Sequence, residues 1–189
     1  MDATAPGRVL IRAAAIRRRI ARLAREISDH YRGDDLTLLG ILNGSVFFLA
    51  DLARQLSMPF RLECWRLRSY VGKTTRSSGI IRGLGTPPGT FAGSNVLIVD
   101  DILDTGLTLA AAKRRLLQMG ASSVRVCVLL RKRKRRAHRV RADWSGFEIP
   151  DAFVIGCGLD YDGMFRALPD IRSLTPIAAP RPGTTTRQK

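Results

Sequence analysis

Short apolar runs alternate with longer amphipathic segments along most of this chain, and the two patterns predict strands and helices. Residues 13–31 carry aliphatic side chains at helical spacing with arginine on the opposite face, which predicts a helix. Further helices are predicted at 46–56 and at 108–119, where Gly120 ends the pattern. Apolar runs predict buried strands at 36–42, 61–68, 96–99, 124–130 and 153–156.

Strands that alternate with helices predict an α/β fold with a central parallel sheet covered by helices on both faces. Ligands of such sheets bind beyond the carboxyl ends of the strands. Residues 1–176 are predicted to form one domain, and 177–189 a disordered tail. Segment 70–94, rich in Gly, Ser, Thr and Pro, has the length of a lid, with short strand pieces expected near 79–82. The alternative is a loop without a role.

The most informative segment, residues 98–109, joins a predicted strand to a predicted helix. Asp100 and Asp101 end the strand, and Asp104 opens a turn of small residues. Backbone N–H groups and the positive end of a helix dipole favour an anion such as phosphate there. Carboxylates beside it suit metal-held hydroxyls and proton transfer. The alternative is an ordinary turn in which Thr108 caps the helix and the acids are solvated.

Four blocks of this sequence, in the same order, resemble the hypoxanthine-guanine phosphoribosyltransferases of the type I phosphoribosyltransferase family. The blocks are residues 40–52, 69–79, 98–109 and 146–166. The resemblance implies the type I fold, with a central parallel sheet flanked by helices, a small hood and a mobile lid loop starting at Ser69 and Tyr70. It implies an enzyme of purine salvage that uses Mg²⁺ to transfer the phosphoribosyl group of 5-phosphoribosyl-1-pyrophosphate (PRPP) to hypoxanthine or guanine. The products would be IMP or GMP and pyrophosphate.

The resemblance also implies roles for residues of the acidic segment. Asp104 matches the general base that takes the purine N7 proton, although an aspartate here could also close a simple turn. Asp100 and Asp101 match the pair that addresses the ribose hydroxyls directly or through Mg²⁺. The cradle of the 5′-phosphate is matched by Thr105, Gly106, Leu107 and Thr108.

The pyrophosphate site implied by the resemblance combines Leu42, Asn43 and Gly44 with Arg166. In relatives the peptide bond before the second of these residues can be cis. Many relatives carry Lys or Arg at the position of Asn43, so one positive contact is absent here. A plain turn before the helix is the alternative for this loop.

The purine site implied by the resemblance begins with Lys132, which matches the lysine that hydrogen-bonds the 6-oxo group. Phe153 matches the aromatic ring that stacks on the base, and Val154 and Asp160 match backbone carbonyls at its amino edge. The Asp160 side chain also matches a ligand of a second Mg²⁺. The alternatives are a solvated charge for Lys132, which lies in a basic run, and ordinary strand core for Phe153. Cys157 stands where relatives often have tyrosine.

The chain carries 32 Lys and Arg against 16 Asp and Glu, a formal net charge of +16. The excess is concentrated at 17–25 and 125–141. Such a balance suits polyphosphate substrates, but it also suits a regulatory RNA-binding protein built on the same fold. The third interpretation is a solvated arginine-rich surface, which we favour for 17–25. Aromatic content of 6% argues against stacking platforms for single strands. The presence of Asp104, Lys132 and Asp160 favours an enzyme, and another base such as xanthine is an alternative substrate.

Cysteine usage and hydropathy bear on the compartment. The three cysteines are widely spaced and form no C-x-x-C motif, which favours a reducing compartment. We find no apolar signal segment and no apolar run of about 18 residues, so we expect a cytoplasmic protein without a membrane span. The resemblance implies a homodimer or homotetramer.

Overall fold

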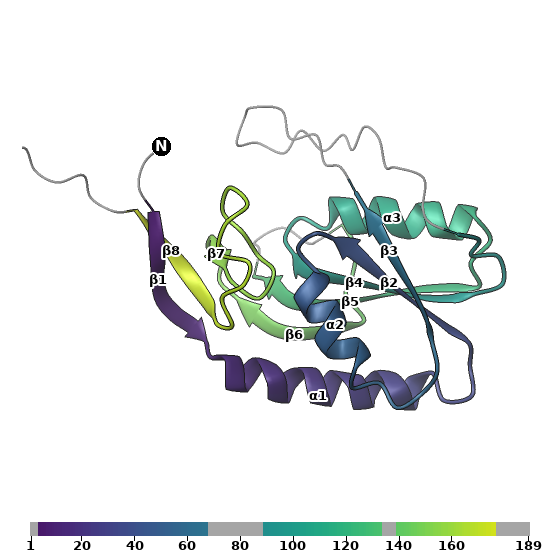
Figure 1. Ribbon diagram of the computed structural model, residues 1–189. Coiled ribbons are helices and arrows are strands. Elements are labelled where there is room, and N and C mark those ends of the chain that lie inside the picture. Colours follow the sequence, from purple (N-terminus) through teal and green to yellow (C-terminus); the bar gives the residue numbers. More distant parts are fainter. Residues whose placement is uncertain (1–3, 68–88, 134–138, 177–189) are drawn as a thin grey trace, which may run out of the picture.

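A five-stranded parallel sheet with helices on both faces forms the centre of the structure, a computed structural model that describes residues 4–67, 89–133 and 139–176 (Figure 1). The strand order is β3-β2-β4-β5-β6. The strands are β2 (Leu36–Leu42), β3 (Arg61–Arg66), β4 (Asn95–Leu103), β5 (Ser123–Lys132) and β6 (Trp144–Ile149). Helices α1 (Ala13–His30) and α2 (Val46–Ala53) lie on one face and α3 (Leu107–Gln118) on the other.

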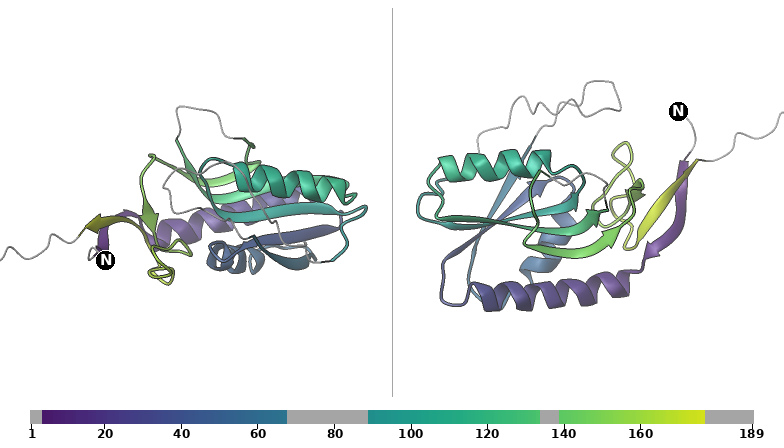
Figure 2. Two further views of the ribbon diagram at one scale, coloured as in Figure 1. Left: turned by 90° about the horizontal axis from the view of Figure 1, so that it is seen from above. Right: turned by 180° about the vertical axis from the view of Figure 1, so that it is seen from behind.

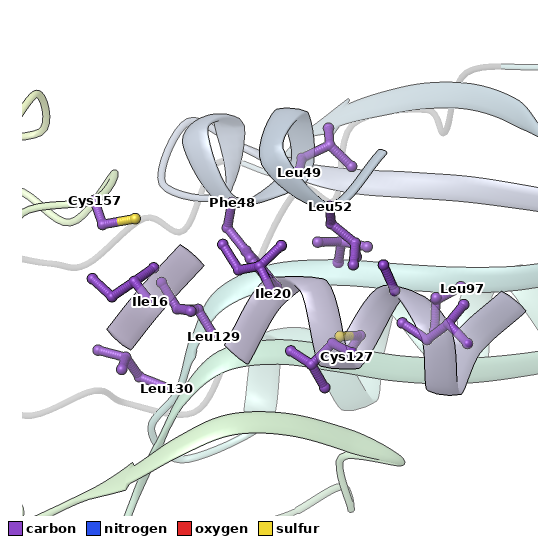
Figure 3. Close-up of a cluster of buried hydrophobic side chains, with 14 of the residues drawn as sticks. Ile16, Ile20, Phe48, Leu49, Leu52, Leu97, Cys127, Leu129, Leu130 and Cys157 are labelled. Atoms are coloured by element: carbon purple, nitrogen blue, oxygen red, sulfur yellow. The ribbon is translucent and has the colours of Figure 1, made fainter. Parts of the chain in front are cut away.

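The strands of the sheet are runs of apolar residues because helices cover both faces of the sheet. On β4, Leu97 and Val99 pack under α1 and α2, whereas Val96 and Ile98 pack under α3. Figure 3 shows the first of these cores, where side chains of the two helices interdigitate with those of β4 and β5. Each large side chain buried in this way stabilises the fold by roughly 1.5–3 kcal/mol.

A second, antiparallel sheet brings the two ends of the described chain together beside the start of α1 (Figure 2). Its strands are β1 (Thr4–Ile11), β8 (Ile171–Pro176) and β7 (Val154–Ile155), in the order β1-β8-β7. Asp170, just before β8, accepts the Ala13 backbone N–H at 2.8 Å and so caps α1 in place of Arg12, whose side chain makes no cap. This hydrogen bond holds the pKa of the Asp170 carboxyl below its usual value. The small sheet is the hood expected for this fold.

The predicted α/β class is confirmed, and each helix and strand predicted within the described residues is present. The helix predicted at 46–56 ends earlier, at Ala53, and β4 runs four residues past the predicted strand end at Val99. Strands β1, β6 and β8 were not predicted, because their sequences mix polar and apolar residues without a clear period. The proposed lid start at Ser69 and Tyr70, the strand pieces near 79–82 and the tail 177–189 lie outside the described residues.

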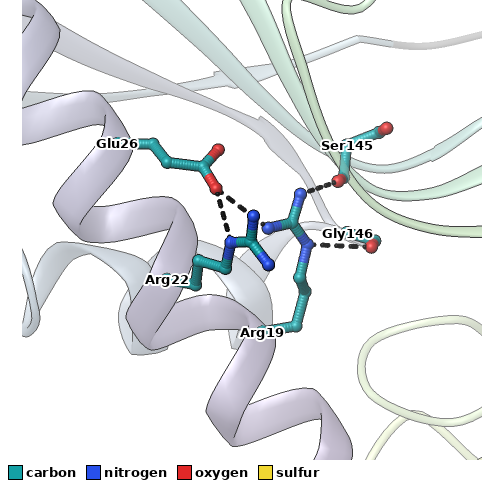
Figure 4. A network of polar contacts seen from close by, with 5 residues as sticks. All are labelled: Arg19, Arg22, Glu26, Ser145 and Gly146. Atoms are coloured by element: carbon teal, nitrogen blue, oxygen red, sulfur yellow. Dashed lines mark hydrogen bonds and ion pairs between the residues drawn. The ribbon is translucent and has the colours of Figure 1, made fainter.

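One arginine of α1 is structural, contrary to our interpretation of the basic helix as a solvated surface. Arg19 donates from Nε to the Gly146 carbonyl at 3.0 Å and from Nη2 to the Ser145 carbonyl at 2.7 Å, while Glu26 accepts from its Nη1 (Figure 4). The Arg19 side chain is 24% exposed, whereas that of Arg22 is 71% exposed. Arg19 therefore ties α1 to edge strand β6.

Replacement of Arg19 by alanine should lower the free energy of unfolding by about 2–3 kcal/mol, because two charged hydrogen bonds to backbone carbonyls are lost. Arg22→Ala, on the same helix and also paired with Glu26, is the matched control and should cost less than about 0.5 kcal/mol. Urea denaturation of both variants measures the difference. Equal destabilisation would show that Arg19 does not anchor the helix.

Candidate active site

The carboxyl ends of β2, β4 and β5 meet at one edge of the parallel sheet, and the predicted site residues gather there. Asp100 and Asp101 lie within β4, and Lys132 is the last residue of β5. Asn43 follows β2 directly. The structure therefore brings to one edge of the sheet residues as distant in the sequence as Asn43 and Lys132.

The turn between β4 and α3 is fixed by a left-handed glycine and by hydrogen bonds of its backbone. Gly106 adopts a left-handed backbone with φ 78° and stands at the N-cap of α3. A Cβ atom there would lie 3.2 Å from the backbone nitrogen of Arg139, which donates to the Thr105 carbonyl. Thr105 Oγ1 accepts the Leu107 N–H at 3.4 Å. Thr108 lies inside the helix, so the alternative in which Thr108 caps it is wrong.

The paired carboxyls of β4 are buried side by side, and burial disfavours the charged form of each. The backbone N–H of Asp101 donates to Asp100 Oδ1 at 3.0 Å, and the two side chains share a hydrogen bond. The pKa of Asp100 lies well above its usual value. The main cause is burial of the carboxyl, and the second is the negative charge of Asp101. Burial also raises the pKa of Asp101, opposed in part by its hydrogen bonds and by Arg166. A cation or a hydroxyl donor at this place would relieve the strain of ionising both groups.

The loop after β2, which contains Gly44, lies between Asp101 of β4 and the glycine-rich turn after β7. The Leu42–Asn43 peptide bond is cis, as the resemblance implied. A Cβ atom on Gly44 would lie 1.8 Å from Asp101 Oδ2, and one on Gly158 would lie 1.9 Å from the Gly44 carbonyl oxygen. Ser45 is fully buried and donates to the Ile41 carbonyl, which closes the turn into α2. Only glycines fit these contacts.

Arg166 is held over this loop by the same turn. Its Nη1 donates to the Gly158 carbonyl, and its Nη2 lies 2.7 Å from Asp160 Oδ1. Asp160 Oδ2 in turn accepts the Gly163 N–H at 2.7 Å. Cys157, also in this turn, has a positive φ of 49° and is buried, which raises the pKa of its thiol to about 11. The turn thus holds one cation and one carboxylate together, and its Gly158 lies against Gly44 of the predicted pyrophosphate loop.

Lys132 lies between two carboxylates and is only 12% exposed, so it is not a solvated member of the basic run. Its Nζ is 3.3 Å from Asp104 Oδ2 and 3.3 Å from Asp151 Oδ1. Its neighbours Arg131 and Arg133 point to the other side of the strand, because side chains alternate along β5. Both of these arginines donate to Glu148.

Phe153 is 56% exposed, so the alternative of ordinary strand core is wrong for this residue. Its ring meets Tyr161 edge to face, with centroids 5.8 Å apart. Val154, by contrast, is buried in β7 and pairs with Ser173 of β8. The exposed ring therefore comes directly before a strand whose backbone is fixed in the hood.

The carboxylates of the site do not by themselves make a metal centre. In the part of the chain that the structure describes, no group of three or more His, Cys, Asp or Glu side chains is arranged to hold an ion. Asp100 and Asp101 form one pair, and Asp160 is engaged by Arg166. Oxygen donors of this kind fit Mg²⁺, which commonly keeps several waters and takes substrate phosphate as further ligands.

Sequence reasoning missed Asp151 and Glu148. Neither contact could be inferred locally, because each depends on the register that pairs Lys132 with Ile149 and Arg131 with Glu148 across β5 and β6. The position of Asp151, two residues before the predicted stacking residue Phe153, was the one available signal.

Fold and site together define an α/β protein that gathers acidic and basic side chains at the carboxyl edge of its parallel sheet. The family model of the phosphoribosyl transferase domain matches residues 10–162. The chain is 44% identical over 174 residues to the hypoxanthine-guanine phosphoribosyltransferase of Mycobacterium avium, covering 89% of this chain and 85% of that protein. It is 39% identical over 167 residues to the hypoxanthine phosphoribosyltransferase of Escherichia coli strain K12, covering 86% and 92%.

Solved structures agree. A hypoxanthine phosphoribosyltransferase from Staphylococcus aureus matches with a TM-score of 0.84 and 32% identity, covering 90% of this chain and 92% of that one. The chain belongs to the hypoxanthine-guanine phosphoribosyltransferase family, which confirms the predicted family, fold and transferase class. No helix within the described residues is long and apolar enough to cross a membrane.

Gly158→Ala should destabilise the protein by at least about 2 kcal/mol more than Gly163→Ala, because the added Cβ meets a backbone carbonyl that cannot move cheaply. Gly163 is a matched control in the same turn: its φ is also positive, at 78°, and nothing lies within 4 Å of its Cβ position. The control should lose only the about 1–2 kcal/mol of a left-handed residue. Thermal unfolding compares the two, and equal losses would contradict the close approach.

Proposed function

We propose that this enzyme transfers the phosphoribosyl group of PRPP to hypoxanthine and guanine, forming IMP or GMP and pyrophosphate in purine salvage. The observation that carries this proposal is the 3.3 Å contact between Lys132 Nζ and Asp104 Oδ2. It sets a hydrogen-bond donor beside an acceptor. A 6-oxopurine presents the complementary pair on one edge, with O6 as acceptor and N7–H as donor. Adenine carries an amino donor at position 6, which would face the ammonium of Lys132.

Asp104 is the proposed general base. When a purine nitrogen displaces pyrophosphate from C1 of PRPP, the base becomes positively charged and loses its N7 proton to this carboxylate. The 5′-phosphate of PRPP would lie in the turn of Thr105 to Thr108, where the backbone N–H groups at the start of α3 favour an anion. Asp100 and Asp101 would accept hydrogen bonds from the ribose hydroxyls.

The leaving pyrophosphate would be bound by Arg166 and by the backbone of Leu42, Asn43 and Gly44. Asn43 offers a neutral side chain, so Arg166 supplies the positive side-chain charge among these residues. When bound, Mg²⁺ would add positive charge on the departing oxygens, with Asp160 or the Asp100–Asp101 pair holding it through water and substrate oxygens. Phe153 would stack on the base, and the carbonyls of Val154 and Asp160 would address its amino edge.

The RNA-binding alternative is weakened by ion pairing. Glu148 accepts hydrogen bonds from both Arg131 and Arg133, and Asp143 pairs with Arg125. Part of the basic run is therefore neutralised, and we propose that any nucleic-acid binding is incidental. Xanthine also carries a 6-oxo group and remains an arm of the activity test.

We propose a homodimer or homotetramer in the cytoplasm. Support for assembly comes from exposed apolar side chains near the site, with Val46 43% and Phe47 41% exposed at the start of α2. Support for a reducing compartment comes from the cysteines, all of which are free.

The proposed function is tested by a turnover assay with PRPP, Mg²⁺ and five bases, namely hypoxanthine, guanine, xanthine, adenine and uracil. We expect nucleotide from hypoxanthine or guanine, none with EDTA present, and at least about 100-fold lower kcat/KM for adenine, because a donor then faces a buried donor. Folded protein that turns over no purine, or prefers adenine, would contradict the proposal.

Asp104→Asn should keep the shape of the site and lower kcat by about 10²–10⁴-fold, the usual loss when a general base is removed. PRPP affinity should change little, because the phosphate and hydroxyl contacts remain. Single-turnover kinetics separate the chemical step from product release, and calorimetry measures PRPP binding. An unchanged chemical rate would remove Asp104 from the role of base.

A further inference from the structure

Lys132 is held by a second carboxylate that the proposed chemistry does not use. Asp151 Oδ1 lies 3.3 Å from Lys132 Nζ, the same distance as Asp104 Oδ2 on the other side. The Lys132 side chain is 12% exposed, whereas those of Asp104 and Asp151 are 45% and 51% exposed. A nearly buried ammonium is thus suspended between two half-exposed acids.

The backbone around Asp151 gives its carboxylate a defined place. Lys132 pairs in register with Ile149, and the N–H of Arg133, directly after β5, donates to the Ile149 carbonyl at 2.7 Å. Asp151 follows two residues later, in a tight turn closed by the Ala152 N–H donating to the Pro150 carbonyl at 2.8 Å. The end of β5 and this turn are therefore joined both by backbone and by the ion pair.

The same turn leads directly to the exposed ring of Phe153. Phe153, which is 56% exposed, lies two residues after Asp151, so the ion pair links the side chain facing position 6 of the purine to the segment that carries its stacking partner. Loss of the ion pair between Lys132 and Asp151 would allow the end of β5 and the segment that carries Phe153 to move relative to each other.

We infer that Asp151 is a positioning residue that holds the Lys132 ammonium at the 6-oxo position and so sets the affinity for 6-oxopurine bases. This inference rests on the proposed function. When a purine binds, Asp104 must turn one oxygen to the N7–H, and Lys132 must donate to O6. Because Asp151 stays paired with Lys132 while the purine binds, the ammonium keeps its position when the Asp104 carboxylate turns toward the N7–H. Without Asp151 the base has to compete with a tighter Lys132–Asp104 pair.

Glu148 provides a matched control at the same end of the sheet. It is three residues from Asp151 and carries the same charge, but it pairs with Arg131 and Arg133 on the opposite side of β5. Glu148→Gln and Asp151→Asn each remove one negative charge near the site while keeping side-chain shape. Only Asp151→Asn removes a partner of Lys132.

The test compares the wild-type protein with Asp151→Asn, Asp151→Glu and Glu148→Gln in steady-state assays with hypoxanthine and guanine, together with melting temperatures. In Asp151→Asn we expect KM for both bases to rise about three- to tenfold, the effect of a partly exposed ion pair, while KM for PRPP stays within about twofold. Asp151→Glu, which restores the charge, should recover most of the loss. Glu148→Gln should leave both KM values near those of the wild type.

Three results would overturn the inference. Base KM in Asp151→Asn could match that of Glu148→Gln, which would show a general charge effect. KM for PRPP could rise as much as KM for the base, or Asp151→Glu could be as impaired as Asp151→Asn, either of which would point to loss of local structure. Wild-type protein that turns over no base would instead overturn the proposed function, and this inference with it.

Discussion

Parallel pairing of β2, β4 and β5 is the constraint on which the rest of this structure depends. The register sets Leu36 to Gly40 beside Asn95 to Val99, and Asn95 to Leu103 beside Ser123 to Arg131, so the three strands end together. Because the side chains of each strand alternate between two buried faces, a slip by one residue would exchange the two cores. The same slip would turn Lys132 away from Asp104. Stability and site geometry are thus fixed by one set of backbone hydrogen bonds.

The loop after β2 and the turn after β7 approach the end of β4 so closely that glycines stand at the points of contact. Gly44 lies directly against Asp101, and Gly158 directly against the carbonyl of Gly44. Three segments distant in sequence are packed here with no room for a methyl group. This packing brings Arg166 to the loop after β2 and keeps Asp101 within reach of its charge, which lowers the pKa that burial raises.

The charge excess of the chain is put to several different structural uses. Arg19 ties a helix to an edge strand, Arg131 and Arg133 share Glu148, and Arg166 is oriented by Asp160. Arg19 and Arg166 each make more than one polar contact in a fixed geometry, which a planar guanidinium does better than an ammonium. The lysine at the centre of the site is different, since the compact ammonium of Lys132 lies between two acids.

The sequence by itself determined the α/β class, the positions of the three helices and of five of the eight described strands, and the acidic turn at 98–109, because these depend on local periodicity and on residue types that suit a phosphate. The confirmed family resemblance supplied the candidate residues around that turn. Tertiary structure alone decided that Thr108 is not a cap, that Phe153 is exposed and that Arg19 is an anchor. It also decided the partners of Lys132. The pairing of Asp151 and Glu148 with opposite sides of β5 follows from the register between two strands, and register is a long-range property that no local pattern of residues encodes.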